Sequence, residues 1–147
     1  MPSLDQTDRA ILRALQHNAK ESYSTIARTL NVSEGTIRSR IRKMLDDGVF
    51  DFIVHTDPKK IGLDVQVIVG INTRLGQQQH VALQLQTFEA VRFVGAFSGN
   101  HDLMIQAYFS TNEELVSFIN ADLAAIEGIL DVDVNVELKQ YKDSFSY

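Results

Sequence analysis

The apolar residues of this 147-residue chain change their spacing near Pro58, and this change limits the folds open to the chain. Before Pro58 they recur every three or four positions, which is the period of an amphipathic helix. After Gly62, segments appear in which they alternate with other residues, which is the period of a half-buried strand. Pro58 and Gly62 both interrupt regular structure, so the segment around them predicts a linker. We therefore expect two small domains that differ in secondary structure.

Three short helices are expected before the linker. The apolar residues of positions 4–30 fit two helices, and those of positions 34–46 fit a third. Ser22 and Ser33 are the expected N-caps of the second and third helices, because a serine hydroxyl accepts a hydrogen bond from an unpaired N–H of the first turn. Asn31 tolerates the left-handed conformation, which favours a tight turn between these two helices.

Strands are expected on both sides of the linker. Residues 49–55 alternate loosely and predict a short strand before it. After the linker, four alternating segments and two segments of helical spacing follow in the order strand, helix, strand, strand, helix, strand. The strands are expected near residues 65–71, 91–97, 103–109 and 130–138, and the helices near residues 77–88 and 112–127. This order is typical of a ferredoxin-like, split βαβ unit in which both helices cover one face of the sheet.

The opposite face of that sheet is expected to be too apolar for water in its middle strands. Its predicted members are Gln66, Ile68, Gly70, Asn72, Arg92, Val94, Ala96, Ser98, Met104, Gln106, Tyr108, Asp133, Asn135 and Glu137. Residues Val91, Phe93, Gly95 and Phe97, and the alternating residues from Leu130 to Leu138, are expected on the covered face instead. Self-association is the simplest use for the apolar face, and a face merely tolerated in solvent is the alternative.

The charge of the chain is unevenly distributed. The net charge is -5 at pH 7, but residues 1–57 hold eight basic and eight acidic side chains, and residues 58–147 hold six and eleven. The acidic excess therefore lies wholly in the second part. Within the first part, the window from Thr36 to Lys43 contains four basic residues and no acidic one. A local basic surface is compatible with the negative total.

A tight turn followed by a third helix is the layout of a helix-turn-helix, whose last helix lies in the DNA major groove. On a helical wheel, the small and basic residues of positions 33–43 lie away from or beside the apolar face. The candidate DNA contacts are Ser33, Gly35, Thr36, Arg38, Ser39, Arg40, Arg42 and Lys43. Small residues let the helix approach base edges, and flanking cations reach phosphates. An ordinary solvated helix face, or a protein-binding helix-turn-helix, fits the same residues.

The chain resembles the Lrp/AsnC (feast/famine) family of transcription regulators along essentially its whole length. The residues that carry the resemblance in the first half are Leu4, Asp5, Asp8, Ile11, Leu12, Leu15, the region of Asn18, Ser22, Ile26, Ala27, Val32, Ser33, Thr36, Ile37, Arg40, Ile41, Leu45 and Gly48. The second half is similar to the family's βαββαβ effector-sensing domain. The expected fold is thus α+β, with a winged-helix-like helix-turn-helix domain at 1–49, a strand and linker at 50–64, and a sensing and oligomerisation domain at 65–147.

The resemblance implies a regulator that binds double-stranded DNA and responds to a small effector, commonly an amino acid. It also implies a homodimer that assembles further, for example into an octamer, so that several helix-turn-helices raise avidity together. Arg40 matches the family pattern and flanks the outer face, so we expect it to be a principal DNA contact. The competing hypothesis is an oligomeric small-molecule sensor without specific DNA binding.

In this family a Gly-x-x-Asp element between the second and third strands of the sensing domain helps to form the effector pocket. Here the element is Gly99-Asn100-His101-Asp102, preceded by Ser98. Backbone N–H groups of such a turn suit a carboxylate, and Asp102 suits an α-amino group. These five residues are the candidate effector site. They also have the chemistry of a plain hairpin turn, and both roles are compatible.

One departure from the family pattern concerns the last strand. Many members carry Thr-x-Thr near its start, whereas this chain has Val132-Asp133-Val134. This departure from the family pattern implies a less polar effector, a different pose or no effector at all. We hypothesise an apolar amino acid, branched or sulfur-containing, as the effector.

Several classes of protein are disfavoured by what the sequence lacks. It has no cysteine, which removes disulfides, thiolate zinc sites and cysteine nucleophiles. Its four histidines are scattered without metal-ligand spacing, and it contains no GxGxxG, P-loop or GxSxG motif. We expect no catalytic residue, no metal and no cofactor beyond the effector. It has neither a signal-peptide pattern nor an apolar run near the roughly 18 residues of a membrane span, so we expect a soluble, cytoplasmic, DNA-associated protein with no membrane partner.

Overall fold

The computed structural model of this protein describes residues 3–142. It divides into two compact units, one running to His55 and taking in Lys142, the other running from Thr56 to Tyr141. Each unit has its own buried apolar cluster. Residues 1–2 of the expected helix-turn-helix domain and residues 143–147 of the expected sensing domain lie outside the described residues.

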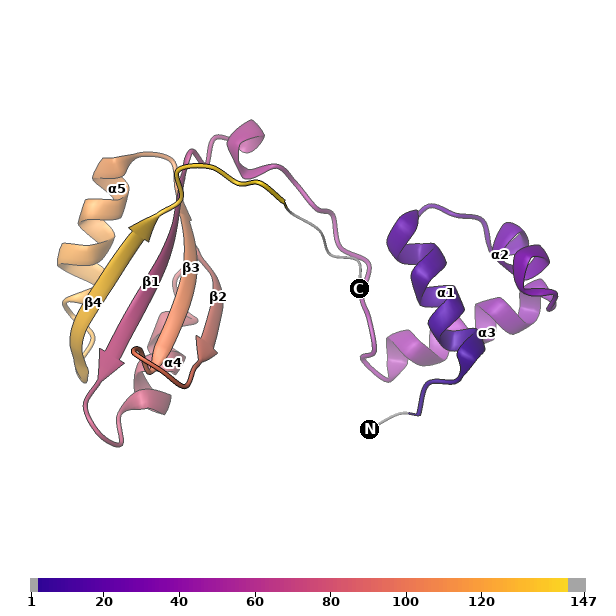
Figure 1. Cartoon of the computed structure of the whole chain (residues 1–147), viewed down its shortest axis with the longest axis horizontal. Helices are drawn as coiled ribbons and strands as arrows, with labels where there is room; N and C mark the ends of the chain where they lie inside the picture. The colour runs from indigo at the N-terminus through magenta and orange to yellow at the C-terminus, as the bar shows by residue number, and fades with distance from the viewer. Residues whose placement is uncertain (1–2, 143–147) are drawn as a thin grey trace. The chain divides into compact units, whose positions relative to one another are not determined.

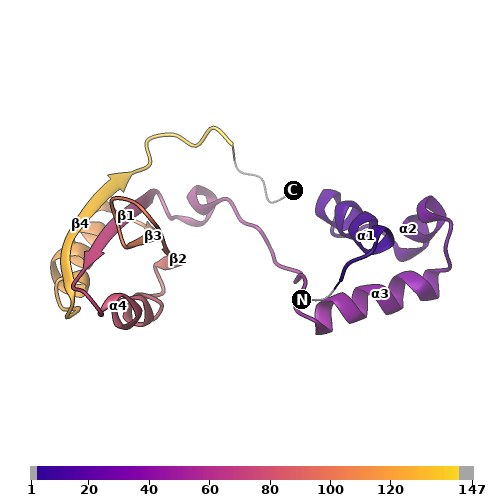
Figure 2. The ribbon, with the colours of Figure 1, turned by 60° about the horizontal axis from the view of Figure 1, so that its bottom comes forward.

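The N-terminal unit is built from three helices (Figures 1 and 2). They are α1 (Gln6–His17), α2 (Tyr23–Leu30) and α3 (Glu34–Asp46). Their apolar faces meet in one cluster, whose buried members are Ile11, Leu15, Ile26, Ala27, Ile37, Ile41 and Met44. The helical spacing of the sequence is confirmed for all three, and α3 has the predicted bounds.

Local side-chain chemistry sets the ends of these helices. Ser22 Oγ accepts a hydrogen bond from the Thr25 N–H at 3.1 Å, and Ser33 Oγ accepts one from the Thr36 N–H at 3.1 Å. Asn31 adopts the left-handed conformation, with φ 54° and ψ 46°, between α2 and α3. Both predicted N-caps and the predicted tight turn are therefore confirmed.

The strand expected at residues 49–55 is wrong. The backbone from Phe50 to Asp57 has no regular structure, and the Ile53 and Val54 side chains are 76% and 90% exposed. A strand is stabilised by hydrogen bonds to a neighbouring strand, and the alternating pattern does not supply that neighbour. The linker that follows holds one 3-10 turn, η1 (Pro58–Ile61), which ends at Gly62 with a φ of 85°.

The C-terminal unit has the predicted βαββαβ order. Its elements are β1 (Val65–Thr73), α4 (Gln78–Leu85), β2 (Val91–Ala96), β3 (Leu103–Phe109), α5 (Asn112–Ser117), the π-helical turn η2 (Phe118–Leu123) and β4 (Ile129–Val136). The strands form one sheet in the order β2-β3-β1-β4, and every neighbouring pair is antiparallel (Figure 1). This order places β2 and β4 at the two edges.

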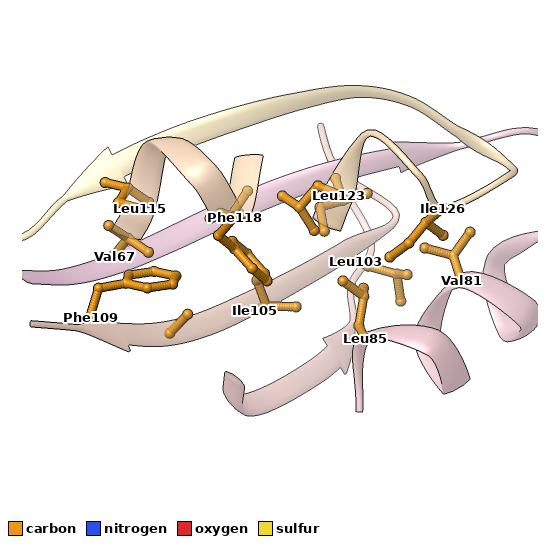
Figure 3. Close-up of a cluster of buried hydrophobic side chains, with 13 residues drawn as sticks. Val67, Val81, Leu85, Leu103, Ile105, Phe109, Leu115, Phe118, Leu123 and Ile126 are labelled. Atoms are coloured by element: carbon orange, nitrogen blue, oxygen red, sulfur yellow. The ribbon is translucent and has the colours of Figure 1, made fainter. Parts of the chain in front are cut away.

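One face of the sheet carries the core of this unit (Figure 3). Side chains of α4, α5 and η2 converge on alternate residues of β1 and β3. The buried members include Val67, Val69 and Ile71 from β1, Ile105 and Phe109 from β3, Val81 and Leu85 from α4, and Leu115, Phe118 and Leu123 from α5 and η2. Both helices therefore cover the same face, as predicted, and no element among residues 3–142 covers the opposite, open face.

A β-bulge in β2 reverses the predicted faces of that strand. Val91 pairs with Ala107, but Phe93 already pairs with Gln106, so one extra residue lies between the two pairs. Beyond the bulge, Val94 packs against the core, and Phe93 follows its partner Gln106 onto the open face. The prediction that Phe93 is covered and Val94 open was wrong, because a one-residue shift moves each later side chain to the other face.

A second irregularity lies between β1 and β4, at the step from Asn72 to Thr73. Asn72 pairs with Asp131 and Thr73 pairs with Ile129, so Leu130 is the unpaired residue. Ile129 packs against the core, and Leu130 is exposed. The predicted placement of Leu130 on the covered face is therefore wrong for the same physical reason.

Candidate functional site

The outer face of α3 presents most of the predicted DNA contacts to solvent. Ile37, Ile41 and Met44 are buried, as the helical wheel requires. The residues exposed beside them are Ser33, Gly35, Arg38, Ser39, Arg42 and Lys43, whereas Thr36 and Arg40 are half-buried. The structure thus brings six of the eight candidates to one accessible region of the three-helix unit.

Arg38 lies at the edge of this face and contacts two neighbours. Its Nη2 atom donates to Glu34 Oε1 at 2.9 Å, and its guanidinium lies 5.5 Å from the centre of the Tyr23 ring. The Arg38 side chain is 62% exposed. An exposed pair of this kind contributes little to stability, so Arg38 remains available to an anionic partner.

Arg40 has a different environment. Its Nη1 atom donates to Asp5 Oδ2 at 2.6 Å and to Asp8 Oδ1 at 2.9 Å, and its side chain is only 33% exposed. Asp5 and Asp8 form the capping box of α1, in which each carboxylate accepts from the backbone N–H of the other residue. Arg40 therefore links the middle of α3 to the beginning of α1.

Electrostatics favour the charged forms of this cluster. The Asp8 backbone N–H, and after it the Arg40 guanidinium, hold the pKa of Asp5 below its usual value. The Asp5 carboxylate, and after it Asp8, raise the pKa of Arg40. The sequence contained the capping-box spacing of Asp5 and Asp8, but nothing in it indicated that Arg40 would be their partner.

The predicted effector residues lie at the turn between β2 and β3. The Phe97 N–H donates to the Asp102 carbonyl at 3.1 Å and closes the turn. Ser98, Gly99 and Asn100 are exposed, and Gly99 has a φ of 137°, which favours glycine. The hairpin role of this segment is therefore confirmed.

Asp102 connects this turn to the end of β1. Its Oδ2 atom accepts from the Thr73 N–H at 2.8 Å and from the Thr73 hydroxyl at 3.1 Å, and Thr73 is buried. Its carbonyl also accepts from Gln78 Nε2 at 2.9 Å. Sequence reasoning missed Thr73 and Gln78, because both lie far from Asp102 along the chain.

His101 folds onto the open face of the sheet, where Gly70 makes room for its ring. A β-carbon on Gly70 would overlap the imidazole Cδ2 atom of His101. The Nε2 atom lies 3.6 Å from Asp133 Oδ2, and Nδ1 is buried without a hydrogen-bond partner in the part of the chain that the structure describes. His101 and Asp133 are thus brought together, which the sequence did not indicate.

Val132 and Val134 are not part of this arrangement. They pair with Ile71 and Val69 and pack against the core. Asp133 pairs with Gly70, so it projects to the open face beside His101. The residues that replace the family's Thr-x-Thr therefore point away from the side on which His101 lies.

Neither a metal-binding cluster nor a membrane-spanning helix occurs among residues 3–142. No group of three or more His, Asp or Glu side chains there is arranged to hold a metal ion. No helix in that range is long and apolar enough to cross a membrane.

The two units match two family models in the order in which they occur. An AsnC-type helix-turn-helix domain matches residues 4–45, and an Lrp/AsnC ligand binding domain matches residues 66–147. The chain belongs to the Lrp/AsnC family. It is therefore a helix-turn-helix transcriptional regulator with a ligand-binding domain, as the sequence resemblance implied, and this family is one of regulators rather than of enzymes.

Two related transcriptional regulators align with nearly the whole of this Lrp/AsnC chain. An uncharacterised HTH-type transcriptional regulator of Pyrococcus horikoshii is 33% identical over 90% of this chain and 85% of the relative. The HTH-type transcriptional regulator LrpA of the same organism is 29% identical over 95% of this chain and 99% of the relative.

Solved structures share the fold of this Lrp/AsnC regulator. E. coli AsnC superposes with a TM-score of 0.89 at 24% identity, covering 97% of both chains. A transcriptional regulator of Neisseria meningitidis, solved as a complex with L-Met, also gives 0.89, at 22% identity over 99% of this chain and 96% of the other. The α+β fold predicted from the sequence is thus confirmed.

Proposed function

We propose that this Lrp/AsnC regulator contacts double-stranded DNA through the outer face of α3. The observation that carries the proposal is the exposed surface of α3 itself. Gly35 and Ser39 are small enough to approach base edges, and Arg42 and Lys43 provide cations for phosphates. Ser33, Thr36 and Arg38 complete the proposed contact surface.

The salt dependence of DNA binding tests this assignment. The probe is a duplex enriched by the protein itself from a random-sequence pool, and its affinity is measured over a series of NaCl concentrations. Arg42→Gln should weaken binding and reduce the slope of log affinity against log salt by about 0.9, which is the loss of one phosphate contact. The matched control is Arg13→Gln, which removes the same charge from the exposed surface of α1. An unchanged slope for Arg42→Gln would contradict the proposed surface.

We further propose that an amino acid modulates this binding, and that residues 98–102 contact it. The exposed Ser98-Gly99-Asn100 turn offers backbone groups beside the sheet, and His101 adds a polar ring whose buried Nδ1 atom has no hydrogen-bond partner among residues 3–142. Asp102 shapes the turn through Thr73. The L-Met complex of the Neisseria regulator supports an amino acid of apolar character as the ligand.

A thermal-shift panel of the twenty amino acids tests the effector. We expect branched or sulfur-containing amino acids to raise the melting temperature, because a ligand that binds only the folded state stabilises it. His101→Ala should abolish the shift. His80→Ala, which changes an exposed residue of α4, should retain it. Stabilisation by polar amino acids alone, or by none, would contradict the proposal.

A second copy of this chain is the proposed partner of the open face. Phe93 and Phe97 are 50% and 46% exposed there, and their rings contact each other across Gly95 with centroids 6.3 Å apart. A homodimer would bury them, and association of dimers into a larger ring such as an octamer would present several α3 helices to DNA together.

A further inference from the structure

We infer that Arg40 is a positioning residue that fixes α3 on α1, rather than a group that contacts DNA. The inference rests on the proposed use of α3 for DNA binding. It starts from the cluster of Arg40, Asp5 and Asp8, in which one guanidinium nitrogen donates to two carboxylates.

The two carboxylates are held in place by the backbone of α1, independently of Arg40. Asp5 Oδ1 accepts from the Asp8 N–H at 2.8 Å, and Asp8 Oδ2 accepts from the Asp5 N–H at 3.1 Å. Each carboxylate therefore uses one oxygen to cap α1 and the other to accept from Arg40. Because the acceptors are fixed to the backbone of α1, the bonds fix the position of the guanidinium as well.

The charge of the cluster argues against a phosphate contact. One guanidinium and two carboxylates carry a net charge of -1, so the cluster as a whole is repelled by a polyanion. If Arg40 moved to a phosphate, Asp5 and Asp8 would lose their cation while facing added negative charge. If one of the exposed cations Arg38, Arg42 and Lys43 contacted a phosphate, no pair of acids on α1 would lose its cation.

The place of Arg40 on α3 explains how it acts on the binding surface. It lies next to Ser39 on the exposed face and next to Ile41 in the buried cluster. A bond from this position to the start of α1 restricts rotation and sliding of α3 about its apolar contacts. The outer face is then presented to DNA in one orientation, which lowers the cost of ordering on binding.

Charge-removing substitutions on both sides of the cluster test the inference. Arg40→Gln should weaken binding to the enriched duplex measurably, by up to about tenfold, and leave the slope of log affinity against log salt unchanged. A direct phosphate contact would instead reduce that slope by about 0.9. Arg40→Lys should restore part of the affinity, because an ammonium group still reaches one carboxylate.

The acidic partners give the sharper test, because the two models differ in sign. Asp5→Asn keeps a good N-cap, since asparagine and aspartate cap helices equally well, but removes the partner charge. Positioning predicts weaker DNA binding by Asp5→Asn and Asp8→Asn, although each removes a negative charge near DNA. Release of Arg40 to a phosphate predicts tighter binding. Asp46→Asn removes the same charge from the exposed end of α3 and should not weaken binding.

All affinities are measured well below the melting temperature of each variant. Tighter binding by Asp5→Asn, or a salt slope reduced by about one in Arg40→Gln, overturns the inference while leaving the proposed function intact. Affinities unchanged in every variant overturn it too, and indicate that the cluster serves folding alone. A wild-type protein that binds no duplex overturns the proposed function and this inference together.

Discussion

Gly70 and Gly95 each leave room for aromatic rings on the open face of the sheet. The His101 ring occupies the space that a side chain at Gly70 would fill. At Gly95, an added β-carbon would lie 2.6 Å from the Phe93 ring and 2.8 Å from the Phe97 ring. Neither position requires a positive φ, so the glycines are needed for close approach rather than for backbone conformation.

Gly70→Ala should destabilise the protein by about 1–3 kcal/mol, because the new methyl group forces the His101 ring out of its place. Urea denaturation of the single variants and of the double variant Gly70→Ala/His101→Ala measures the effect. The double variant should recover most of the loss, since the alanine at position 101 no longer overlaps the methyl group. Equal losses in the single and double variants would show that the ring is not the obstacle.

Interactions between residues that are close along the chain could be predicted from the sequence, and those between distant residues could not. The N-caps Ser22 and Ser33 and the left-handed Asn31 were predictable, because each depends on neighbours within three or four positions. The bonds of Arg40 to Asp5 and of Asp102 to Thr73 join residues about thirty positions apart. No periodicity or motif connects such residues, so these partners emerge only from the folded chain.

At the scale of elements, the identity and order of the helices and of the four sheet strands follow from hydrophobic period. The faces of β2 do not follow beyond Arg92, because the bulge that reverses Phe93 and Val94 leaves no mark in an alternating pattern. The failed strand at residues 49–55 has a related cause. Alternation indicates that a segment is suited to form a strand, but strand pairing requires a partner outside the segment.

The junction of α1 with α3 should weaken in acid. Folding lowers the pKa of Asp5, so its contribution to stability is present above the unfolded pKa, which is about 3.9, and is lost as pH falls through the lower folded value. Amide hydrogen exchange in α1 should therefore accelerate as pH falls below about 4, after correction for intrinsic rates. In Asp5→Asn this additional acceleration should be reduced. An identical pH profile in both proteins would contradict the account of the cluster.

At the scale of the whole molecule, we predict that the open face of the sheet holds two chains together. Phe93→Glu should convert a dimer or larger assembly into monomers, because it places a charge among apolar side chains that association would bury. Native mass spectrometry and sedimentation velocity report the mass directly. Leu83→Glu is the matched control, because Leu83 is exposed on α4, an element that covers the opposite face. An unchanged assembly in Phe93→Glu would place the interface elsewhere.

The charge distribution sets how the assembled molecule should meet DNA. Residues 1–57 carry equal numbers of acidic and basic side chains, so one helix-turn-helix has little general attraction for a polyanion. Affinity should then come from the local cations of α3 and from linking several units. We therefore expect the affinity for the preferred DNA sequence to be much higher than the affinity for non-specific DNA.

Competition between two duplexes tests whether α3 recognises a DNA sequence. One is the duplex that the protein enriches from a random pool, and the other has the same base composition in scrambled order. At physiological salt, we expect the protein to bind the enriched duplex about a thousandfold or more tighter than the scrambled one, and Arg42→Gln should reduce that margin. Equal affinity for the two duplexes would contradict sequence-specific recognition by α3 and would favour an oligomeric sensor that reads its ligand without reading DNA.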